Sequence, residues 1–454
     1  MSADVLILGA GPAGLGAAYR VAQTGRRVRV IEREPCVGGL AASFEVAGQR
    51  VDHGSHRLHP STPEPIMATL RSLLGDDLQR RPRHGRIRMA GRFVAFPPKA
   101  ADLVRHFPPA LSARLALDMA TSPFRRARAD TFAEVVRASL GPTMTDRFYA
   151  PYVEKLFGVP ATGLAGELAR RRVGARSASA LVRRVVRPDP NRGIFFYPRR
   201  GYGQISEVLA DAATAAGAEI LTSTDVSAID ATGVTSGDGG RHDAAMVWST
   251  LPLALVARLA SAPDDVLAAA ARLETRALLL VYLALPTCRW TEFDAHYFPE
   301  ADVPLSRISE CKNYRDSADD PRDVTVLCAE VPCALGDRRW NETSDELAAQ
   351  VRDAIARSAL AIPTPIDVAV RRVPRAYPIY RLGYEQPFAA LDAWASSQPN
   401  FLHFGRQGLF AHDNTHHALA MAWAAADALA EGGTVDERAW HRARATFATH
   451  VVED

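Results

Sequence analysis

The stretch that decides the fold runs from Asp4 to Gly39, DVLILGAGPAGLGAAYRVAQTGRRVRVIEREPCVGG. Its apolar run VLIL predicts a buried parallel strand, and the pattern G-x-G-x-x-G follows directly over residues 9–14. The first glycine permits a tight turn, the second lets a pyrophosphate approach the backbone, and the third lets the next helix pack close to the strand. A second strand, residues 28–31, ends at Glu32, where a carboxylate can bind a ribose. Strand, glycines, helix, strand and acid in this order predict a dinucleotide-binding unit.

A second glycine pair, Gly38-Gly39, comes six residues after Glu32 and is followed by Leu40. With this extension the stretch resembles the flavin amine oxidase superfamily, in which a second glycine-rich turn lies against the diphosphate of FAD. The resemblance implies FAD, rather than NAD, as the cofactor. No second G-x-G-x-x-G is visible further along the sequence, which argues against a separate nicotinamide-binding domain.

The segment GRQGLFAHDN at residues 405–414 resembles the G-R-x-G-x-x-x-Y-x-N segment of the same superfamily, with His412 where tyrosine is usual. That segment carries contacts to the diphosphate and the pyrimidine of the flavin. The helix that follows would point its N-terminus at the N1–C2=O edge of the flavin, where negative charge accumulates on reduction. The glycine turns, this segment and a strand expected beside the adenine give the predicted cofactor-binding residues: Gly9, Gly11, Pro12, Ala13, Gly14, Glu32, Arg33, Gly38, Gly39, Leu40, Val226, Gly405, Arg406, Asn414 and Thr415.

Three histidines stand at intervals of three, at His53, His56 and His59. A metal site would need a further acid or cysteine at suitable spacing, so no metal site is predicted, and an ordinary surface loop is one alternative. The pattern G-x-H-x-x-H also resembles the segment that lies over the flavin in UDP-galactopyranose mutases. The similar pattern D-x-G-x-H-R occurs in bacterial protoporphyrinogen-oxidase-like proteins. We favour this resemblance, which implies that His56 and Arg57 lie near the isoalloxazine ring.

Two further segments, RISECKN at residues 307–313 and AYPIY at residues 376–380, resemble stretches of the same family. Arginine suits bidentate oxygen ligands, so these segments predict a pocket for an anionic or hydroxylated substrate. Charges at a sheet edge and packed tyrosines, including Tyr380, are the alternative. The candidate catalytic residues are His56, Arg57, Arg307, Lys312 and Tyr377.

The composition is that of a soluble globular protein, with 47% hydrophobic and 23% charged residues in a chain of 454. A net charge of +3 is too small to indicate a nucleic-acid partner. Five scattered cysteines without a C-x-x-C pair fit a reducing cytoplasm. The longest strongly apolar run, residues 278–285, is far too short to span a membrane. Nothing in the sequence indicates the oligomeric state.

The predicted fold class is α/β, and the length is too great for one ordinary core. The resemblance implies a Rossmann-like FAD-binding domain of the GR2 type, assembled from the discontinuous segments 1–61, 195–265 and 395–454. Residues 62–194 are expected to form a helical insert, and residues 266–394 an antiparallel-sheet domain that binds substrate. Because each segment would supply part of one site, truncation should be poorly tolerated.

The resemblance implies an FAD-dependent oxidoreductase, either an oxidase or a dehydrogenase. It would take a hydride from a C–H next to N or O of a polar small molecule, with glycosyl compounds and specialised metabolites as candidates. O2 or an electron carrier would be the acceptor. The alternative is a non-redox UDP-sugar mutase that uses reduced FAD. A flavin-binding protein without activity is a third hypothesis, disfavoured by the flavin-facing segments at both ends.

Overall fold

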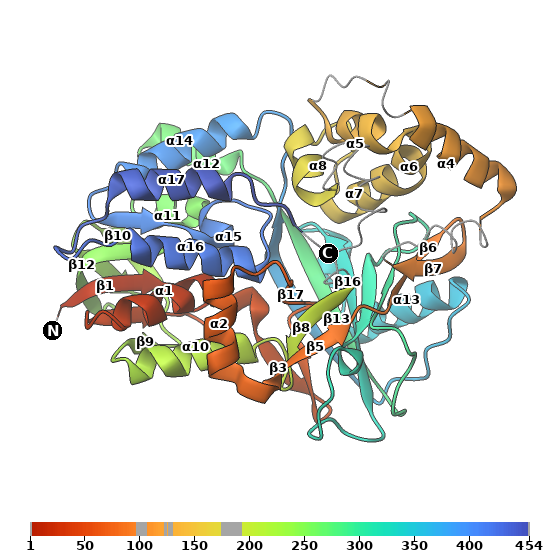
Figure 1. Cartoon of the computed structure of the whole chain (residues 1–454), viewed down its shortest axis with the longest axis horizontal. Coiled ribbons are helices and arrows are strands. Elements are labelled where there is room, and N and C mark those ends of the chain that lie inside the picture. Colours follow the sequence, from red (N-terminus) through yellow and green to blue (C-terminus); the bar gives the residue numbers. More distant parts are fainter. Residues whose placement is uncertain (1, 97–106, 122–124, 126–129, 174–192, 453–454) are drawn as a thin grey trace.

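The structure is a computed structural model, and it describes residues 2–96, 107–121, 125, 130–173 and 193–452. Figure 1 shows two main halves, a sheet covered by helices on the left and a second, barely covered sheet on the right. A group of helices lies above the second sheet. The expected α/β fold class is confirmed. Among the described residues no helix is long and apolar enough to cross a membrane.

The first sheet is built around β1 (Ala3–Leu8), whose residues Leu6, Ile7 and Leu8 are completely buried. Burial on both faces is typical of a parallel strand with helices above and below. Five strands of this sheet run parallel, in the order β18 (Phe401–His403), β12 (Arg241–Ser249), β1, β2 (Val28–Ile31) and β9 (Glu219–Leu221). An antiparallel ribbon extends from the first half of β12 and consists of β10 (Val226–Asp230) and β11 (Gly233–Ser236). The strands thus come from chain segments almost 400 residues apart.

Helices cover both faces of the first sheet. One face carries α1 (Pro12–Ala22), α10 (Gln204–Ala215) and α16 (Thr415–Asp427). Small residues let α1 and α16 approach closely, because a Cβ at Gly16 would lie 3.0 Å from Trp423. The outer helices α11 (Leu253–Leu259), α12 (Asp264–Ala271), α14 (Glu385–Ser396) and α17 (Glu437–Phe447) complete this half of the molecule.

The second sheet is antiparallel except where β14 meets β6. Its strand order is β17 (Asp367–Pro378), β13 (Thr275–Leu285), β16 (Thr325–Cys333), β15 (Arg307–Glu310), β14 (Ala295–Tyr297), β6 (Gly85–Met89) and β7 (Arg92–Phe96). Alternate residues of β13 face opposite sides. Leu279 and Val281 pack under α13 (Ser344–Arg357), whereas Leu280 and Tyr282 pack against the hairpin of β3 (Ser43–Val46) and β4 (Gln49–Asp52).

The upper helices form a small core of their own. They are α4 (Pro109–Thr121), α5 (Phe132–Leu140), α6 (Pro142–Met144), η4 (Thr145–Tyr149), α7 (Ala150–Phe157) and α8 (Gly166–Val173). Thr131 begins α5 with a capping box to Glu134. This core also includes Tyr380 and Phe410, so it rests on both halves of the molecule.

The helical insert expected over residues 62–194 is wrong for its first third. Helix α2 (Glu64–Leu74) packs into the core of the first sheet through Met67 and Leu70. Strand β5 (Leu78–Pro82) pairs with β8 (Ile194–Pro198), and β6 and β7 join the second sheet. The reason is the period-2 pattern of β6 and β7, whose inward residues Ile87 and Val94 need an apolar partner sheet. Residues 174–192 lie outside the described part of the chain, and the domain division as a whole stays a prediction.

Candidate active site

The turn between β1 and α1 shows which glycines the fold itself requires. Gly9 has φ +97°, and a Cβ there would lie 2.5 Å from Thr250 Oγ1. A Cβ at Gly14 would lie 1.9 Å from the carbonyl oxygen of Gly9, so only glycine lets α1 pack this close to β1. A Cβ at Gly11 would meet nothing within 4 Å. The space at Gly11 therefore leaves the N-terminus of α1 open to a diphosphate.

The second glycine pair lies against this turn. The N–H of Gly38 donates to the carbonyl of Ala10 at 2.8 Å. A Cβ at Gly39 would lie only 3.4 Å from Gly11 Cα. Leu40 follows in the short helix η1 (Gly39–Ala41). The structure thus brings both predicted glycine turns together, as a cradle for a dinucleotide requires.

The C-terminal segment completes the cradle. Gly405 has φ +82°, and a Cβ there would lie 3.0 Å from Ala13 Cβ, so this turn touches the first turn of α1. Arg406 is held by backbone oxygens, because its Nη2 donates to Ala376 at 2.8 Å and its Nη1 to Asp413 at 3.3 Å. Asn414 is the N-cap of α16, and Thr415 is the first residue of that helix.

Glu32 is fixed at the end of β2 by two backbone donors. Its Oε2 accepts from the N–H of Ala10 at 2.7 Å, and its Oε1 accepts from the N–H of Glu34 at 3.0 Å. Each carboxylate oxygen has a second lone pair, so the group can still accept from ribose hydroxyls. Val226 begins β10, two residues after the backbone N–H of Thr224 binds the carbonyl of Glu32. The cradle and this carboxylate together fit the ADP half of FAD.

Arg33 is the predicted cofactor residue that the structure directs elsewhere. Its side chain is 58% exposed, and its Nε lies 3.2 Å from Glu34 Oε1. A side chain that follows a strand end on the outer side points to solvent, whereas the preceding Glu32 points inward. The sequence motif does not distinguish these two neighbours.

The histidine segment lies beside the cradle. His53 Nδ1 donates to the carbonyl of Gly39 at 3.2 Å, and His56 Nε2 donates to the carbonyl of His53 at 3.0 Å. The ring of His56 stacks on Tyr202, with centroids 5.1 Å apart and planes at 22°. Burial lowers the pKa of His56, and burial with the nearby Arg371 lowers the pKa of His53 to about 4. Both rings are therefore neutral at neutral pH.

Arg57 joins this segment to the second sheet. Its guanidinium lies 3.1 Å from Asp294 and donates to Tyr297 Oη at 3.2 Å. It also lies over the rings of Phe195 and Tyr314, at 5.3 and 4.8 Å from their centroids. Only 10% of the side chain is exposed. These contacts give Arg57 a structural role, and its predicted contact with the flavin ring stays a prediction.

Arg307 forms a second buried ion pair to the same segment. Its Nη2 lies 2.6 Å from Glu330 Oε1 and also donates to the carbonyl of Ser55 at 3.3 Å. Glu330 Oε1 accepts the N–H of Ser55 at 3.0 Å as well. The adjacent Glu330 carboxylate raises the pKa of Arg307 against the opposing effect of burial. Glu330 therefore fixes Arg307 and the loop before His56 in one arrangement.

Tyr377 lies between two guanidiniums. Arg172 lies over its ring at 5.7 Å from the centroid, and Arg406 lies at 5.4 Å. Arg172 also lies over Phe157, at 5.7 Å. No hydrogen bond or ion pair joins Arg172 to any other residue that the structure describes. Tyr377, Arg172, Arg406 and Arg307 form what we call the arginine wall, and each of the three arginines acts electrostatically on the tyrosine.

Comparison with known proteins identifies the family. The family described as flavin containing amine oxidoreductase matches residues 12–430. The chain belongs to this family. It is accordingly an FAD-dependent oxidoreductase, and the cradle described above fits its cofactor.

Solved structures show the same fold as this flavin-dependent oxidoreductase. A reduced UDP-galactopyranose mutase is 21% identical, with all of both chains covered and a TM-score of 0.83. An Exiguobacterium sp. 255-15 protein assigned as a protoporphyrinogen oxidase is 17% identical over 94% of this chain and 98% of that one, with a TM-score of 0.72. Putrescine oxidase bound to putrescine is 18% identical over the same shares, with a TM-score of 0.63.

The similarity to curated sequences is much shorter. A phytoene dehydrogenase from Streptomyces griseus is 41% identical over 76 residues. These residues make up 16% of this oxidoreductase and 15% of that protein. The match therefore says nothing of the substrate of the present enzyme.

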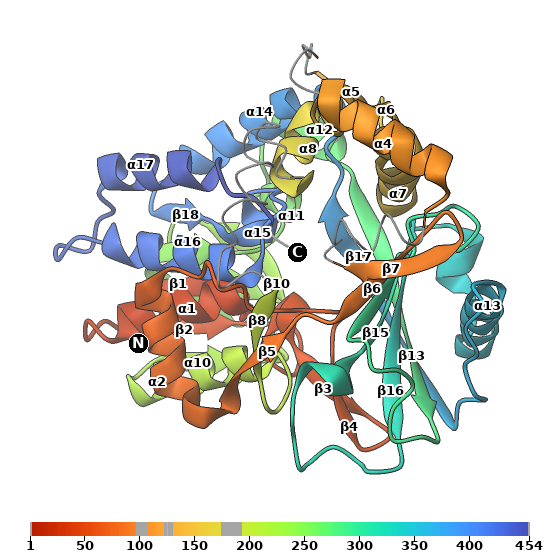
Figure 2. The ribbon, with the colours of Figure 1, turned by 45° about the vertical axis from the view of Figure 1, so that its right-hand side comes forward.

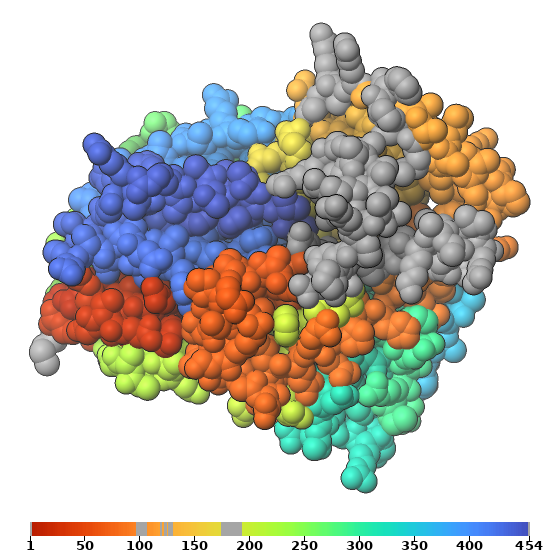
Figure 3. Space-filling view, viewed as in Figure 1, coloured from red at the N-terminus to blue at the C-terminus, as the bar shows by residue number. Residues whose placement is uncertain are grey.

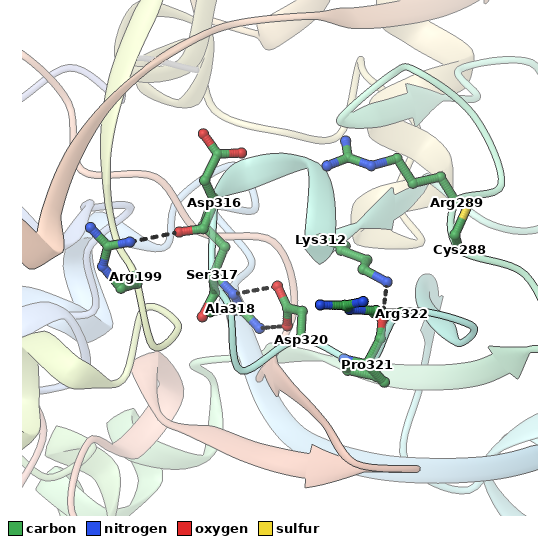
Figure 4. A pocket seen from close by; sticks show the side chains of 11 residues that line it. Arg199, Cys288, Arg289, Lys312, Asp316, Ser317, Ala318, Asp320, Pro321 and Arg322 are labelled. Carbon is green, nitrogen blue, oxygen red and sulfur yellow. Dashed lines mark hydrogen bonds and ion pairs between the residues drawn. The ribbon is translucent and has the colours of Figure 1, made fainter.

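Lys312 is the predicted catalytic residue that the oxidoreductase does not bring to the arginine wall. After β15 the chain turns into η5 (Cys311–Tyr314), and this turn breaks the strand alternation that would have directed Lys312 like Arg307. The Lys312 ammonium donates to the carbonyls of Pro321 and Val324. It lines a separate cavity of about 410 Å³ together with Arg199, Cys288, Arg289, Arg315 and the loop at 316–322 (Figure 4).

Two residues came out differently from the sequence analysis. Tyr380 is packed, because its Oη donates to the carbonyl of Phe410 at 2.9 Å and its ring stacks on Tyr384. Arg172 was missed, because it stands in the basic run RRR at residues 170–172, which is typical of a solvated helix face. The only signal that could have found it is the aromatic cluster around Phe157, which needed a partner.

Proposed function

We propose that this enzyme takes a hydride from a C–H next to N or O of an anionic or hydroxylated small molecule. FAD, when bound, supplies the two-electron acceptor. The observation that carries the choice of substrate is the arginine wall, where Arg172 has no acidic partner among the described residues. Such a guanidinium binds planar oxygen groups well, since it offers several donors in a fixed geometry.

The acidic groups near the wall are already paired. Glu330 binds Arg307, and Asp294 binds Arg57. A cationic amine in the same place would meet guanidiniums without a free carboxylate to offset the repulsion, and Coulomb interactions are strong where water is excluded. The wall therefore favours carboxylate, phosphate or hydroxyl groups over the ammonium groups of a diamine.

The other residues of the site hold geometry. Glu330 fixes the loop at Ser55, and the stack of His56 on Tyr202 fixes the histidine segment beside the glycine turns. The amide end of α16, capped at Asn414, favours negative charge in front of it. In the family arrangement this end faces the pyrimidine edge of the flavin.

A non-redox mutase that works with reduced FAD is the second candidate. Two observations favour it, the G-x-H-x-x-H pattern beside the cradle and the fold shared with a reduced UDP-galactopyranose mutase over the full chain. The arginine wall suits the diphosphate of a nucleotide sugar as well as it suits a simpler anion. Family membership gives the oxidoreductase preference.

An anaerobic substrate screen tests the proposal. Oxidised holoenzyme is mixed with a panel of hydroxylated and anionic compounds, including UDP-sugars and aminocyclitols, and with a matched panel of simple amines. We expect the visible flavin band to bleach once with a member of the first panel, and the product to contain two hydrogens fewer. Addition of O2 or an artificial acceptor should restore the band and allow turnover.

Two outcomes would count against the proposal. An isomeric product that forms only after dithionite reduction would replace the oxidoreductase by the mutase. Bleaching by the amine panel alone would contradict the role of the arginine wall.

A further inference from the structure

Three side chains from two distant parts of the sequence meet at the start of α16. Asp413 precedes the N-cap of this helix, His417 lies on its first turn, and His450 follows α17. Asp413 Oδ1 lies 3.4 Å from the Nδ1 atoms of both histidines. The two rings stack with centroids 4.2 Å apart and planes at 14°. One donor atom from each residue lies within 4.8 Å of the other two.

The carboxylate of Asp413 is unusual for its burial. Its side chain has no exposed surface, and neither of its oxygens has a hydrogen-bond partner among the described residues. The nearby Arg171 is committed elsewhere, because its Nε binds Glu167 at 2.7 Å and its Nη2 donates to the carbonyl of Ala448 at 3.1 Å. A buried carboxylate without partners is costly, so these oxygens call for a cation.

The spacing suits a metal ion. Bonds of about 2.1 Å at tetrahedral angles place neighbouring donor atoms about 3.4 Å apart. His417 Nδ1 accepts the N–H of Asn414 at 3.2 Å, so this nitrogen carries a lone pair. That hydrogen bond is long, and a metal bond in its place would need only a small rotation of the ring. Two imidazole nitrogens and one carboxylate oxygen are donors that Zn²⁺ and related divalent ions prefer.

We propose that Asp413, His417 and His450 bind one divalent metal ion of the Zn²⁺ class, with a fourth position open to water. The ion would join the segment after α17 to the N-terminus of α16, next to the cofactor residues Asn414 and Thr415. It would also fix the backbone at Asp413, whose carbonyl accepts from Arg406. The site is independent of the proposed substrate and would exist in either candidate enzyme.

Metal content tests this proposal directly. The FAD-loaded full chain is stripped with a chelator, dialysed against micromolar Zn²⁺, and analysed for bound zinc by atomic emission. The variant His450→Ala removes one ligand without touching α16, and Asp413→Asn removes the charge. His441→Ala is the matched control, because His441 is exposed on α17. Competition with a chromophoric chelator gives the affinity of each protein.

We expect one zinc ion per chain in the parent and in His441→Ala. Removal of a ligand should weaken binding by about 100-fold or more, since even the loss of an outer partner costs about 10–100-fold. Zinc should also raise the melting temperature of the parent but not that of His450→Ala. A parent that binds no zinc, or His450→Ala and Asp413→Asn variants that retain it with parental affinity, would overturn the proposal. If Asp413→Asn does not fold, His450→Ala decides alone.

Discussion

The dinucleotide cradle and the arginine wall are built by different means. In the cradle, backbone approaches backbone, and the 1.9 Å distance between a Cβ at Gly14 and the carbonyl of Gly9 shows why glycine is required. In the wall, the same residue type serves unlike purposes, since Arg57 and Arg307 are in buried ion pairs while Arg172 lies free over Tyr377. A backbone requirement can be read from residue identity, whereas the role of an arginine depends on its partners.

The largest effect should come from breaking the ion pair in the wall. Replacement of Glu330 by alanine leaves Arg307 buried without its partner and frees the loop at Ser55. We expect Glu330→Ala to lower the free energy of unfolding by about 3–5 kcal/mol. Urea denaturation measures this. The control Glu219→Ala removes a surface partner of Arg29 that is 53% exposed, so its loss should stay below about 1 kcal/mol. Equal losses in the two variants would contradict the buried role of Glu330.

A side chain in the cradle should act on the cofactor and not on the fold. In Gly11→Val the new atoms enter open space in the apoprotein but occupy the place of the diphosphate. We expect FAD affinity to fall by about 1–3 kcal/mol or more, which is tenfold to over 100-fold. Flavin fluorescence titration measures the affinity, and circular dichroism melting of the apoprotein tests the fold.

Gly432→Val is the matched control for this comparison, because a Cβ at Gly432 also meets nothing within 4 Å. Neither glycine has a φ in the left-handed region. If both variants bind FAD as the parent does, the diphosphate does not lie at Gly11.

Removal of the free guanidinium should act on substrate and not on FAD. With the substrate found in the anaerobic screen, we expect Arg172→Ala to raise KM by roughly 10- to 150-fold, because a hydrogen bond to a charged group contributes about 1.5–3 kcal/mol. Bound FAD should be unchanged. Arg114→Ala, an exposed arginine on α4 of the same helical region, serves as control. A loss of flavin in Arg172→Ala would move this residue from the wall to the cradle.

The pH dependence of stability should report the contact between the two regions at His53. Its pKa falls from 6.5 to about 4 on folding because of burial and Arg371. Between these values the unfolded chain binds a proton that the folded chain refuses, so the contribution is complete above pH 6.5 and is lost as the pH falls towards 4. At pH 5 the free energy of unfolding should be lower by about 2 kcal/mol than at pH 8. His53→Gln should lose this component, and parallel curves for parent and variant would refute the assignment.

The smallest effect is expected at Lys312, whose ammonium binds two backbone carbonyls beside a separate cavity. Lys312→Met should leave kcat/KM of the folded enzyme within about twofold of the parent, as expected for a residue outside the site. Anaerobic flavin reduction by the same substrate measures it. A tenfold loss would place Lys312 with Arg307 after all.

The sequence was informative where backbone geometry decided the structure. The glycines, Glu32 and the C-terminal Gly405 could be placed because strand ends and helix starts leave little choice of residue. Arg33, Lys312 and Arg172 could not be assigned, because each lies one residue or one turn from a position that would give it a different partner. The grouping of Asp413, His417 and His450 had only the i, i+4 spacing of its first two members as a signal. The placement of α2, β6 and β7 depended on apolar partners that come later in the chain.

The order of the strands in the first sheet has a consequence for synthesis. β1 gains its outer neighbour β12 only after residue 241, and β12 gains β18 only after residue 401. At about 5–20 residues per second a ribosome needs roughly 20–80 seconds to travel from β1 to β18. During that interval one edge of a strand buried on both faces remains unpaired, and contacts so distant in sequence form slowly. We therefore expect the nascent chain to depend on chaperones and to take up its flavin only after translation has delivered Gly405.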